Sequence, residues 1–322
     1  MIVITGGAGF IGSNLIKKLN IKGIDDILIV DSLGKSEKWK NLVGKKFVDF
    51  IHKSEFLEKL QKNCFPNIKT IVHLGACSST TEKDADYLIA NNFHYTKDLL
   101  HYSLKNNIRF IYASSAATYG AGEFGYSDEL DNINNLQPLN MYGYSKQMVD
   151  EFVIKNNFQN RVAGLKFFNV FGPNEYHKNS MVSMVHRAFE QITTTGKVKL
   201  FKSNCSDFED GMQKRDFVYV KDCTNVIWEL INNSQVNGIF NLGTGKARTW
   251  IDLTNAVFSA LGKQPKINFV EMPEILKGKY QNFTEAEMNK LKSHFSDLKM
   301  TSLEDAVEDY VNNFLIKENQ YN

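Results

Sequence analysis

Tyr142 and Lys146 lie four residues apart, which places both side chains on one face of a helix, about one turn from each other. A free tyrosine has a pKa near ~10 and is therefore a poor base at neutral pH. An ammonium group held beside the phenol favours the phenolate and lowers that pKa. The pair could then take a proton from a hydroxyl group, or return one, while a hydride leaves the same carbon. Since the chain has 13 tyrosines, this spacing also arises by chance, and the surrounding elements decide its meaning.

The amino-terminal residues have the pattern of a dinucleotide-binding unit. Residues 2–4 are a short apolar run typical of a buried parallel strand, and Gly6, Gly9 and Gly12 follow it. Apolar residues then recur at helical spacing, and a second apolar strand closes with Asp31, 19 residues after Gly12. This order of elements predicts a pyrophosphate on the amino end of the helix, where free N–H groups point outward.

Asp31 would hydrogen-bond the adenosine ribose, which nominally favours NAD. Lys35, Lys38 and Lys40 follow closely, however, and a lysine there could neutralise a ribose phosphate. The same lysines could equally form a solvated loop. The residues alone leave both interpretations open.

The alternation of strands and helices continues through the next hundred residues. Residues 70–74 and 109–113 are typical of strands, and residues 84–107 of a helix between them. Ser115 follows the second of these strands, in the crevice where open α/β sheets bind ligands. A serine hydroxyl there could hydrogen-bond the reacting hydroxyl beside Tyr142. Asn140 is positioned to cap the helix that carries the tyrosine and the lysine.

The pattern changes after a strand at residues 162–168 and a turn at residues 169–173. Residues 174–216 are polar and mixed and are expected to form a lid or substrate segment, whereas residues 217–220 and 238–242 are expected to rejoin the first body as strands. The carboxyl-terminal part is expected to be helical with one strand near residues 266–270. The fold class is therefore α/β, a Rossmann-type doubly wound parallel sheet with a smaller, interleaved α/β substrate-binding domain. The expected domain bounds are 1–172 plus about 217–250 for the cofactor domain, and 173–216 plus about 251–322 for the substrate domain.

The composition excludes several classes of protein. A chain of 322 residues with 43% hydrophobic content is long enough for a large core, and a net charge of +2 implies no nucleic-acid or membrane partner. The four cysteines are scattered, as is typical of reduced thiols, and the histidines lack the spacing of a metal site. No apolar run reaches the ~18 residues of a spanning helix, and we expect no signal peptide. These features predict a cytoplasmic protein without a bound metal.

Together these residues resemble the extended short-chain dehydrogenase/reductase family, which includes nucleotide-sugar epimerases and dehydratases. The resemblance covers nearly the whole chain and includes the glycine motif, Ser115, the Tyr142/Lys146 pair and the turn at residues 169–173. Within the family, the likeness is greatest to the epimerases of ADP-linked heptose. The segments that carry this likeness are residues 75–82 and 113–120, His177-Lys178 with Ser180-Met181, and residues 214–220 and 276–280.

The resemblance implies an NADP-dependent epimerisation, with NAD as the alternative cofactor. A hydride leaves the sixth carbon of ADP-D-glycero-D-manno-heptose, a ketone forms, and the hydride returns to the opposite face, which supplies heptose for the lipopolysaccharide core. Tyr142 would be one acid/base, tuned by Lys146, and Lys178 would be the second. The subfamily is oligomeric, which implies a homo-oligomer with a pentamer as one candidate.

The resemblance also assigns binding residues position by position. The residues that match cofactor positions are Gly6, Gly9, Phe10, Ile11, Gly12, Asp31, Ser32, Lys38, Lys53, Leu74, Gly75, Ala76, Cys77, Ser78, Asn91 and Lys146. Those that match substrate positions are Asn169, Val170, Ser180, His186, Phe201, Arg215 and Tyr280.

Three other functions compete with the heptose epimerase. A nucleotide-sugar 4-epimerase of the UDP-galactose type needs the same parts. A dehydratase of this family carries an Asp-Glu pair just after the serine or threonine at the strand end, whereas this chain has Ala116 and Ala117 there. A cofactor-sensing protein with a dead site usually lacks the tyrosine or the lysine, and both are present here.

Overall fold

Short runs of aliphatic residues form a seven-stranded, fully parallel sheet in the computed structural model, which describes residues 1–274 and 280–321. The strand order is β3-β2-β1-β4-β5-β6-β10. Every residue of β1, β2, β4, β6 and β10 is buried, as expected for a parallel sheet that helices cover on both faces. The predicted Rossmann-type sheet is confirmed. Its strands are β1 (Ile2–Thr5), β2 (Ile27–Asp31), β3 (Asp49–His52), β4 (Thr70–His73), β5 (Arg109–Ser115), β6 (Val162–Phe167) and β10 (Gly238–Leu242).

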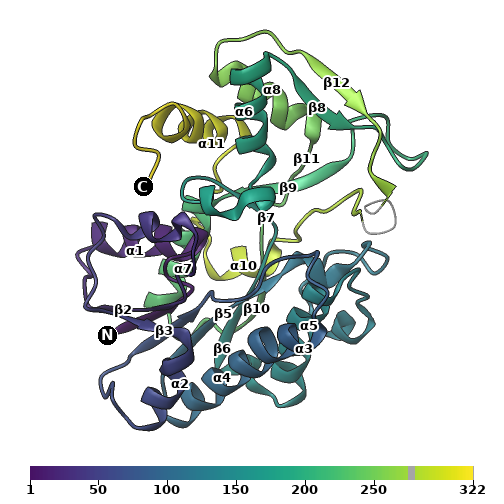
Figure 1. The fold of residues 1–322 in the computed structure, drawn as a ribbon. Coiled ribbons are helices and arrows are strands. Elements are labelled where there is room, and N and C mark those ends of the chain that lie inside the picture. Colours follow the sequence, from purple (N-terminus) through teal and green to yellow (C-terminus); the bar gives the residue numbers. More distant parts are fainter. Residues whose placement is uncertain (275–279, 322) are drawn as a thin grey trace.

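Helices flank this sheet on its two faces, as Figure 1 shows. On one side α1 (Phe10–Ile21) packs against α7 (Val220–Asn232), and on the other lie α2 (Lys53–Gln61), α4 (Tyr95–Lys105) and α5 (Met141–Lys155). The helix α5 carries Tyr142 and Lys146. Its amino end is capped as predicted, because the side-chain oxygen of Asn140 accepts a hydrogen bond of 2.9 Å from the backbone N–H of Gly143.

The helix predicted over residues 84–107 is interrupted. The structure has α3 (Ala85–Leu88), a π-helical stretch at Ile89–His94, and then α4. A π turn inserts an extra residue and is common at functional sites. Here it turns Asn91 toward Lys53, whose Nζ donates to the asparagine Oδ1 at 2.7 Å. Hydrophobic periodicity does not reveal this stretch, because the buried positions before and after it keep a helical spacing.

Two smaller sheets lie beside the main one, toward the top of Figure 1. The three-stranded sheet has the order β11-β9-β7, and β12 pairs in parallel with β8. The predicted turn at residues 169–173 is wrong in its first part, because residues 169–171 form β7. The strand predicted at 217–220 joins this small sheet and not the main one. The strands are β7 (Asn169–Phe171), β8 (Val198–Phe201), β9 (Lys214–Tyr219), β11 (Ala247–Thr249) and β12 (Ile267–Val270).

The region after β7 is more regular than its polar composition indicates. Residues 174–216 contain a helix and a strand as well as loops, because an apolar stripe on the helix packs against the carboxyl-terminal helices. The predicted strand near residues 266–270 is confirmed as β12. The helices of this part are α6 (Met184–Thr195), α8 (Trp250–Ala260), α10 (Asn289–His294) and α11 (Leu303–Tyr310), the last continued by a π-helical stretch at Val311–Leu315.

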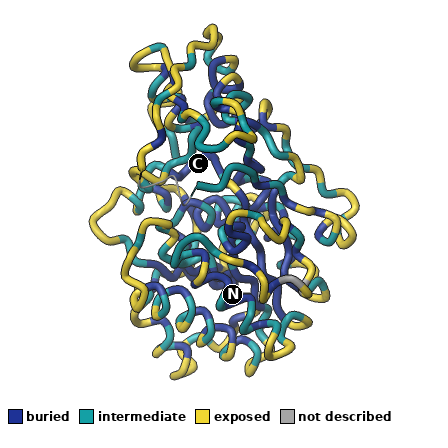
Figure 2. Tube along the Cα trace, turned by 90° about the vertical axis from the view of Figure 1, so that its right-hand side faces the viewer, coloured by how far each residue is buried: buried dark blue, intermediate teal, exposed yellow. Residues whose placement is uncertain are grey.

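Two apolar cores correspond to this arrangement. The larger fills the space around the seven-stranded sheet, and the smaller lies between α6, α8, α11 and β8. Figure 2 shows buried residues along the centre of the molecule and exposed residues mainly in peripheral turns. The division into two interleaved domains stays a prediction. Across residues 1–274 and 280–321, no helix combines the length and the apolar character needed to span a bilayer.

Candidate active-site cleft

A cleft of about 630 Å³ opens at the carboxyl ends of β1, β2, β4 and β5. Ligands of open α/β sheets bind at this edge, and the volume is in the usual range of small-molecule sites. All sixteen residues predicted to contact a cofactor line it, and so do Ser115, Tyr142 and Lys178. The structure thus gathers fifteen predicted residues from the first third of the chain with four from later segments, Ser115, Tyr142, Lys146 and Lys178.

The glycine turn after β1 is packed too tightly for side chains. Gly6 has a φ of +68°, and a Cβ at Gly12 would lie 2.2 Å from the carbonyl oxygen of Gly6. Gly9 precedes α1 without a side-chain cap, so the first N–H groups of this helix are left open toward the cleft. A bare helix amino end beneath a glycine turn fits the pyrophosphate of a dinucleotide.

Asp31 and Lys38 form an ion pair at the end of β2. Lys38 Nζ lies 2.5 Å from Oδ1 of Asp31, and the other carboxylate oxygen accepts the N–H of Ala8 at 2.9 Å. His177 faces the same charges. Burial, together with Lys38 and Lys178, lowers the pKa of His177 to about 4, so this imidazole is neutral at neutral pH. The ion pair leaves little net negative charge where a ribose would lie.

The surroundings of the Tyr142 hydroxyl correct one expectation. Burial raises the pKa of Tyr142, and the contribution that lowers it is the hydrogen bond with the Ser115 side chain and not the Lys146 ammonium. Burial lowers the pKa of Lys146 to about 8, against the opposing effect of Asp150. Lys146 Nζ donates to the carbonyl oxygen of Ala113 at 2.7 Å. The lysine is thus fixed on β5, and the serine supplies the contact that favours the phenolate.

Lys178 faces the cleft from the segment that follows β7. Its Nζ lies 5.0 Å from the centre of the Phe10 ring, within the range of a cation–π contact. Burial lowers the pKa of Lys178, and the Glu175 charge opposes that shift. The buried Glu175 carboxylate holds the segment in place, because it accepts from the Ser183 hydroxyl at 2.7 Å and from the Tyr310 hydroxyl at 3.1 Å. A lysine with a lowered pKa therefore stands in the same cleft as Tyr142.

Of the predicted substrate residues, only Val170 lines this cleft. Arg215 and Tyr280 come together elsewhere, with the guanidinium carbon 4.9 Å from the centre of the tyrosine ring. Trp250 completes this group, since its Nε1 donates to the Tyr280 hydroxyl at 2.8 Å. An arginine stacked on aromatic rings is a surface suited to a planar ligand group. Trp250 is not among the predicted residues, because no sequence motif marks it.

The remaining predicted substrate residues are dispersed. His186 packs against Tyr176, with ring centres 5.6 Å apart and the rings tilted by 48°, and lies outside the cleft. Ser180 uses its carbonyl oxygen to accept from Arg187. Neither they nor Asn169 and Phe201 line the cleft, so their contact with a substrate stays a prediction. Residues 276–279 of the segment that ends at Tyr280 lie outside the described residues.

Eleven further residues line the cleft and are not among the predicted site residues. Six lie at or next to the carboxyl ends of strands, and the other five come from the π-interrupted helix and from the segment around Lys178. His177 could have been found, because it precedes Lys178 in the same motif. Asn179 has a φ of +49° and a ψ of −117°, a conformation that costs a residue with a side chain about 1–3 kcal/mol and that spacing does not show. The additional lining residues are Thr5, Val30, Tyr87, Tyr95, Ala113, Ser114, Phe167, Phe168, His177, Asn179 and Met181.

Comparison with known proteins shows what this chain is similar to. The profile of the "NAD dependent epimerase/dehydratase family" matches residues 2–243. An ADP-L-glycero-D-manno-heptose-6-epimerase of Nitratidesulfovibrio vulgaris is 51% identical over 98% of each chain. A protein of the same name from Fusobacterium nucleatum is 49% identical over 100% of each chain.

Solved structures show the same architecture. The crystal structure of the Helicobacter pylori ADP-L-glycero-D-manno-heptose-6-epimerase is similar with a TM-score of 0.82 and 28% identity, over 97% of this chain and 95% of that one. A Thermus thermophilus UDP-glucose 4-epimerase in complex with NAD gives a TM-score of 0.74 at 23% identity, over 97% of each chain. The second likeness shows the fold alone.

Proposed function

This chain belongs to the NAD dependent epimerase/dehydratase family, and we propose that it converts ADP-D-glycero-D-manno-heptose to ADP-L-glycero-D-manno-heptose by inverting the sixth carbon. The observation that carries the proposal is the presence of two proton-transfer groups, Tyr142 and Lys178, in one cleft with the dinucleotide-binding turn. The relatives that are about half identical over their whole length support this substrate. The product would supply heptose for the lipopolysaccharide core.

The glycine turn and the residues around it would hold a nicotinamide dinucleotide, which takes a hydride from the substrate and returns it when bound. The amino end of α1 would bind the pyrophosphate, and Asp31 and Lys38 would contact the adenosine ribose. Tyr142 accepts the proton of the substrate hydroxyl, and Ser115 aligns that hydroxyl and favours the phenolate. Lys146, which the Ala113 carbonyl holds on β5, would bind the nicotinamide ribose. No net oxidation occurs, because each proton and hydride removed is returned.

We propose NADP as the preferred cofactor, with Lys38 as the contact to its ribose phosphate. Lys38 already offsets the charge of Asp31, which would otherwise repel a phosphate. Lys38→Ala should weaken the binding of NADP by about tenfold or more and that of NAD much less, since a hydrogen bond to a charged group contributes about 1.5–3 kcal/mol. Titration calorimetry with both dinucleotides measures this difference.

Lys40→Ala is the matched control, because Lys40 lies two residues away, pairs with Glu37 and does not line the cleft. It should leave both affinities unchanged. Equal losses for NADP and NAD in Lys38→Ala would mean that this lysine does not bind the phosphate.

A redox-neutral cycle also predicts that purified protein retains its cofactor. Denatured protein should release NADP or NAD in a near-stoichiometric amount. The reaction does not consume the dinucleotide, and several residues along the cleft would hold it. Chromatography of the supernatant measures the amount and the identity of the nucleotide. Protein that is fully active, free of nucleotide and supplied with none would refute the scheme.

We further propose that the chain forms a homo-oligomer, with a pentamer as one candidate. The resemblance to an oligomeric subfamily supports this. Light scattering at assay concentration should give a mass that is a multiple of the 36.7 kDa chain. A monomeric mass under these conditions would end the expectation.

The proposed substrate is tested by comparing ADP-D-glycero-D-manno-heptose with UDP-galactose. Incubation with each sugar nucleotide, followed by nuclear magnetic resonance of the products, should show inversion of the heptose at its sixth carbon and no change in UDP-galactose. Conversion of UDP-galactose to UDP-glucose, with the heptose untouched, would identify a 4-epimerase and overturn the proposal.

A further inference from the structure

A buried ion pair lies behind the helix that carries Tyr142, outside the cleft. Lys166 Nζ on β6 is 2.7 Å from Oδ2 of Asp150 on α5, and the two side chains are 2% and 0% exposed. Neither residue lines the cleft. Burying two charges is favourable only when hydrogen bonds satisfy the rest of each group. The partners of this pair therefore show what it holds together.

Asp150 fastens α5 to the strand that ends in the cleft. It lies two turns beyond Tyr142 on the same helix. Its Oδ1 accepts the Tyr112 hydroxyl at 2.9 Å, and its Oδ2 accepts the Ser114 hydroxyl at 2.6 Å. Both donors belong to β5. The Asp150 carboxylate thus joins α5 to β5 and, through Lys166, to β6.

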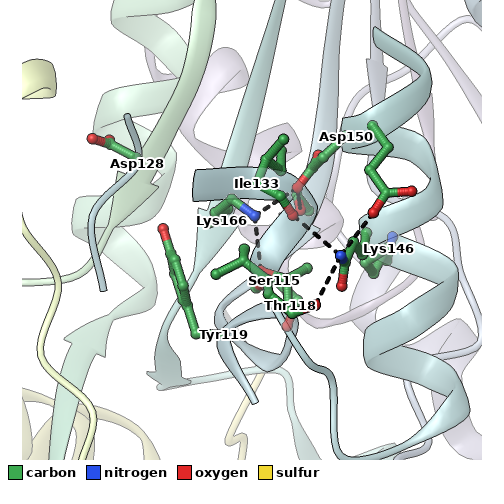
Figure 3. Close-up of polar contacts among 12 residues, drawn as sticks. Ser115, Thr118, Tyr119, Asp128, Ile133, Lys146, Asp150 and Lys166 are labelled. Atoms are coloured by element: carbon green, nitrogen blue, oxygen red, sulfur yellow. Dashed lines mark hydrogen bonds and ion pairs between the residues drawn. The ribbon is translucent and has the colours of Figure 1, made fainter. Parts of the chain in front are cut away.

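Lys166 continues the connection to the catalytic serine. Its Nζ donates to the Thr118 hydroxyl at 2.8 Å, and that hydroxyl donates to the backbone oxygen of Ser115 at 2.9 Å. Figure 3 shows Lys166 between Asp150 and Thr118, with Ser115 beside the threonine. The lysine also lies 5.0 Å from the centre of the Tyr119 ring. The ion pair therefore reaches the backbone of Ser115 through one hydroxyl.

Three consecutive residues at the end of β5 are each held by a different side chain. Lys146 binds the carbonyl of Ala113, Asp150 binds the hydroxyl of Ser114, and Thr118 binds the carbonyl of Ser115. A hydrogen bond weakens steeply with misalignment, so a small shift of this strand end would weaken the contact between the Ser115 and Tyr142 hydroxyls. The position of this strand end therefore affects the pKa of Tyr142 through the Ser115 hydrogen bond.

We propose that Asp150 and Lys166, acting through Thr118, are positioning residues that hold the Ser115 hydroxyl in hydrogen-bonding register with the Tyr142 hydroxyl. This inference rests on the proposed function, because it assigns the buried pair to the same reaction. None of the three residues touches the substrate in this account. They act only by placing Ser115.

The central test is Thr118→Val, which removes the connecting hydroxyl and leaves both charges and nearly the same volume. The kcat should fall by about 10- to 100-fold, because small displacements of a catalytic group cost that much, while KM and dinucleotide binding stay unchanged. The limb of the pH profile that reports Tyr142 should move to higher pH. The shift is toward higher pH because the Ser115 hydrogen bond lowers the pKa of Tyr142, so losing that bond raises the pKa.

Thr254→Val is the matched control. Thr254 is also fully buried, and its hydroxyl donates to the carbonyl oxygen of Trp250 within α8, away from the cleft. It should change neither kcat nor the pH profile. Ser115→Ala gives the reference for complete loss of the contact, and its profile should shift in the same direction as that of Thr118→Val. A normal kcat in Thr118→Val, or an equal loss in Thr254→Val, would overturn the proposal.

The ion pair itself is tested by Lys166→Met and Lys166→Arg. The methionine keeps the length of the side chain without the charge, and the profile should shift as in Thr118→Val. The arginine keeps the cation and should restore most of the activity. If the kcat of Lys166→Arg is no higher than that of Lys166→Met, the charge of Lys166 does not have the proposed role. If the methionine variant does not fold, Thr118→Val decides alone.

A second readout needs no substrate. The ultraviolet absorbance of each protein is recorded as a function of pH. Subtracting the absorbance of the same protein with Tyr142→Phe leaves the signal of Tyr142 ionisation. Thr118→Val should raise the pH of this transition and Thr254→Val should not. Wild-type protein that fails to turn over ADP-heptose counts against the proposed function, whereas an unshifted Tyr142 transition in Thr118→Val counts against this inference.

Discussion

Tyr142→Phe is expected to lower the rate of epimerisation by ~100- to 10,000-fold, the usual contribution of a positioned acid or base. The substitution removes the hydroxyl that we propose as the acceptor of the substrate proton, and it changes the volume little. It raises the activation barrier by about 3–5 kcal/mol. Folding and cofactor retention should survive, because the ring stays in place and Lys146 keeps its bond to the carbonyl of Ala113. Steady-state turnover of ADP-heptose at saturating substrate measures the effect.

Tyr144→Phe provides the matched control on the same helix. Tyr144 lies two residues further on, its side chain is exposed and it does not line the cleft. Its turnover should equal that of the wild type. Near-normal turnover in Tyr142→Phe would place the proton transfer on another group.

Lys178→Met is expected to abolish epimerisation nearly completely while leaving substrate binding largely intact. Inversion requires the hydride to leave one face of the carbon and return to the other, so the oxygen on that carbon occupies two places. We propose that one phenol on a rigid helix does not reach both positions and that Lys178 is the second proton donor. Lys178 enters the cleft from another segment, and burial lowers its pKa toward the range in which a lysine exchanges protons.

The kinetic constants distinguish this role from simple binding. Loss of an acid/base lowers kcat at an unchanged KM, whereas loss of a binding lysine raises KM and spares kcat. Lys263→Met, a substitution of the same kind at an exposed lysine outside the cleft, should change neither constant. A raised KM with normal turnover in Lys178→Met would make Lys178 a binding residue and the two-base scheme wrong for this protein.

The part of the cleft around the glycine turn and α5 could be predicted because its signals are local in the sequence. Gly6, Gly9 and Gly12 specify a turn whose backbone leaves no room for side chains, and the strand before them is uniformly apolar. The spacing of Tyr142 and Lys146 is set by one helix turn. Each of these features depends on residues within a few positions of one another, so a single sequence is enough to reveal them.

The other half depends on contacts that spacing does not encode. The π-helical stretch that orients Asn91 follows from tertiary packing, and the buried positions around it resemble an ordinary helix. The strand β7 forms because β9, more than forty residues later, pairs with it. Arg215 and Tyr280 meet Trp250 only in the folded chain. The pKa of Tyr142 was expected to fall, but desolvation outweighs the hydrogen bond, and burial cannot be read from one helix alone.

The central claim is that the sixth carbon is inverted by removal and return of the same hydride. The most direct test uses ADP-D-glycero-D-manno-heptose carrying deuterium at that carbon, converted in ordinary water and analysed by nuclear magnetic resonance. The inverted product is expected to keep its deuterium, because the hydride never exchanges with solvent while the cofactor stays bound. An inverted product that carries hydrogen from water at the sixth carbon would contradict it, since inversion would then proceed by loss and gain of a proton at carbon.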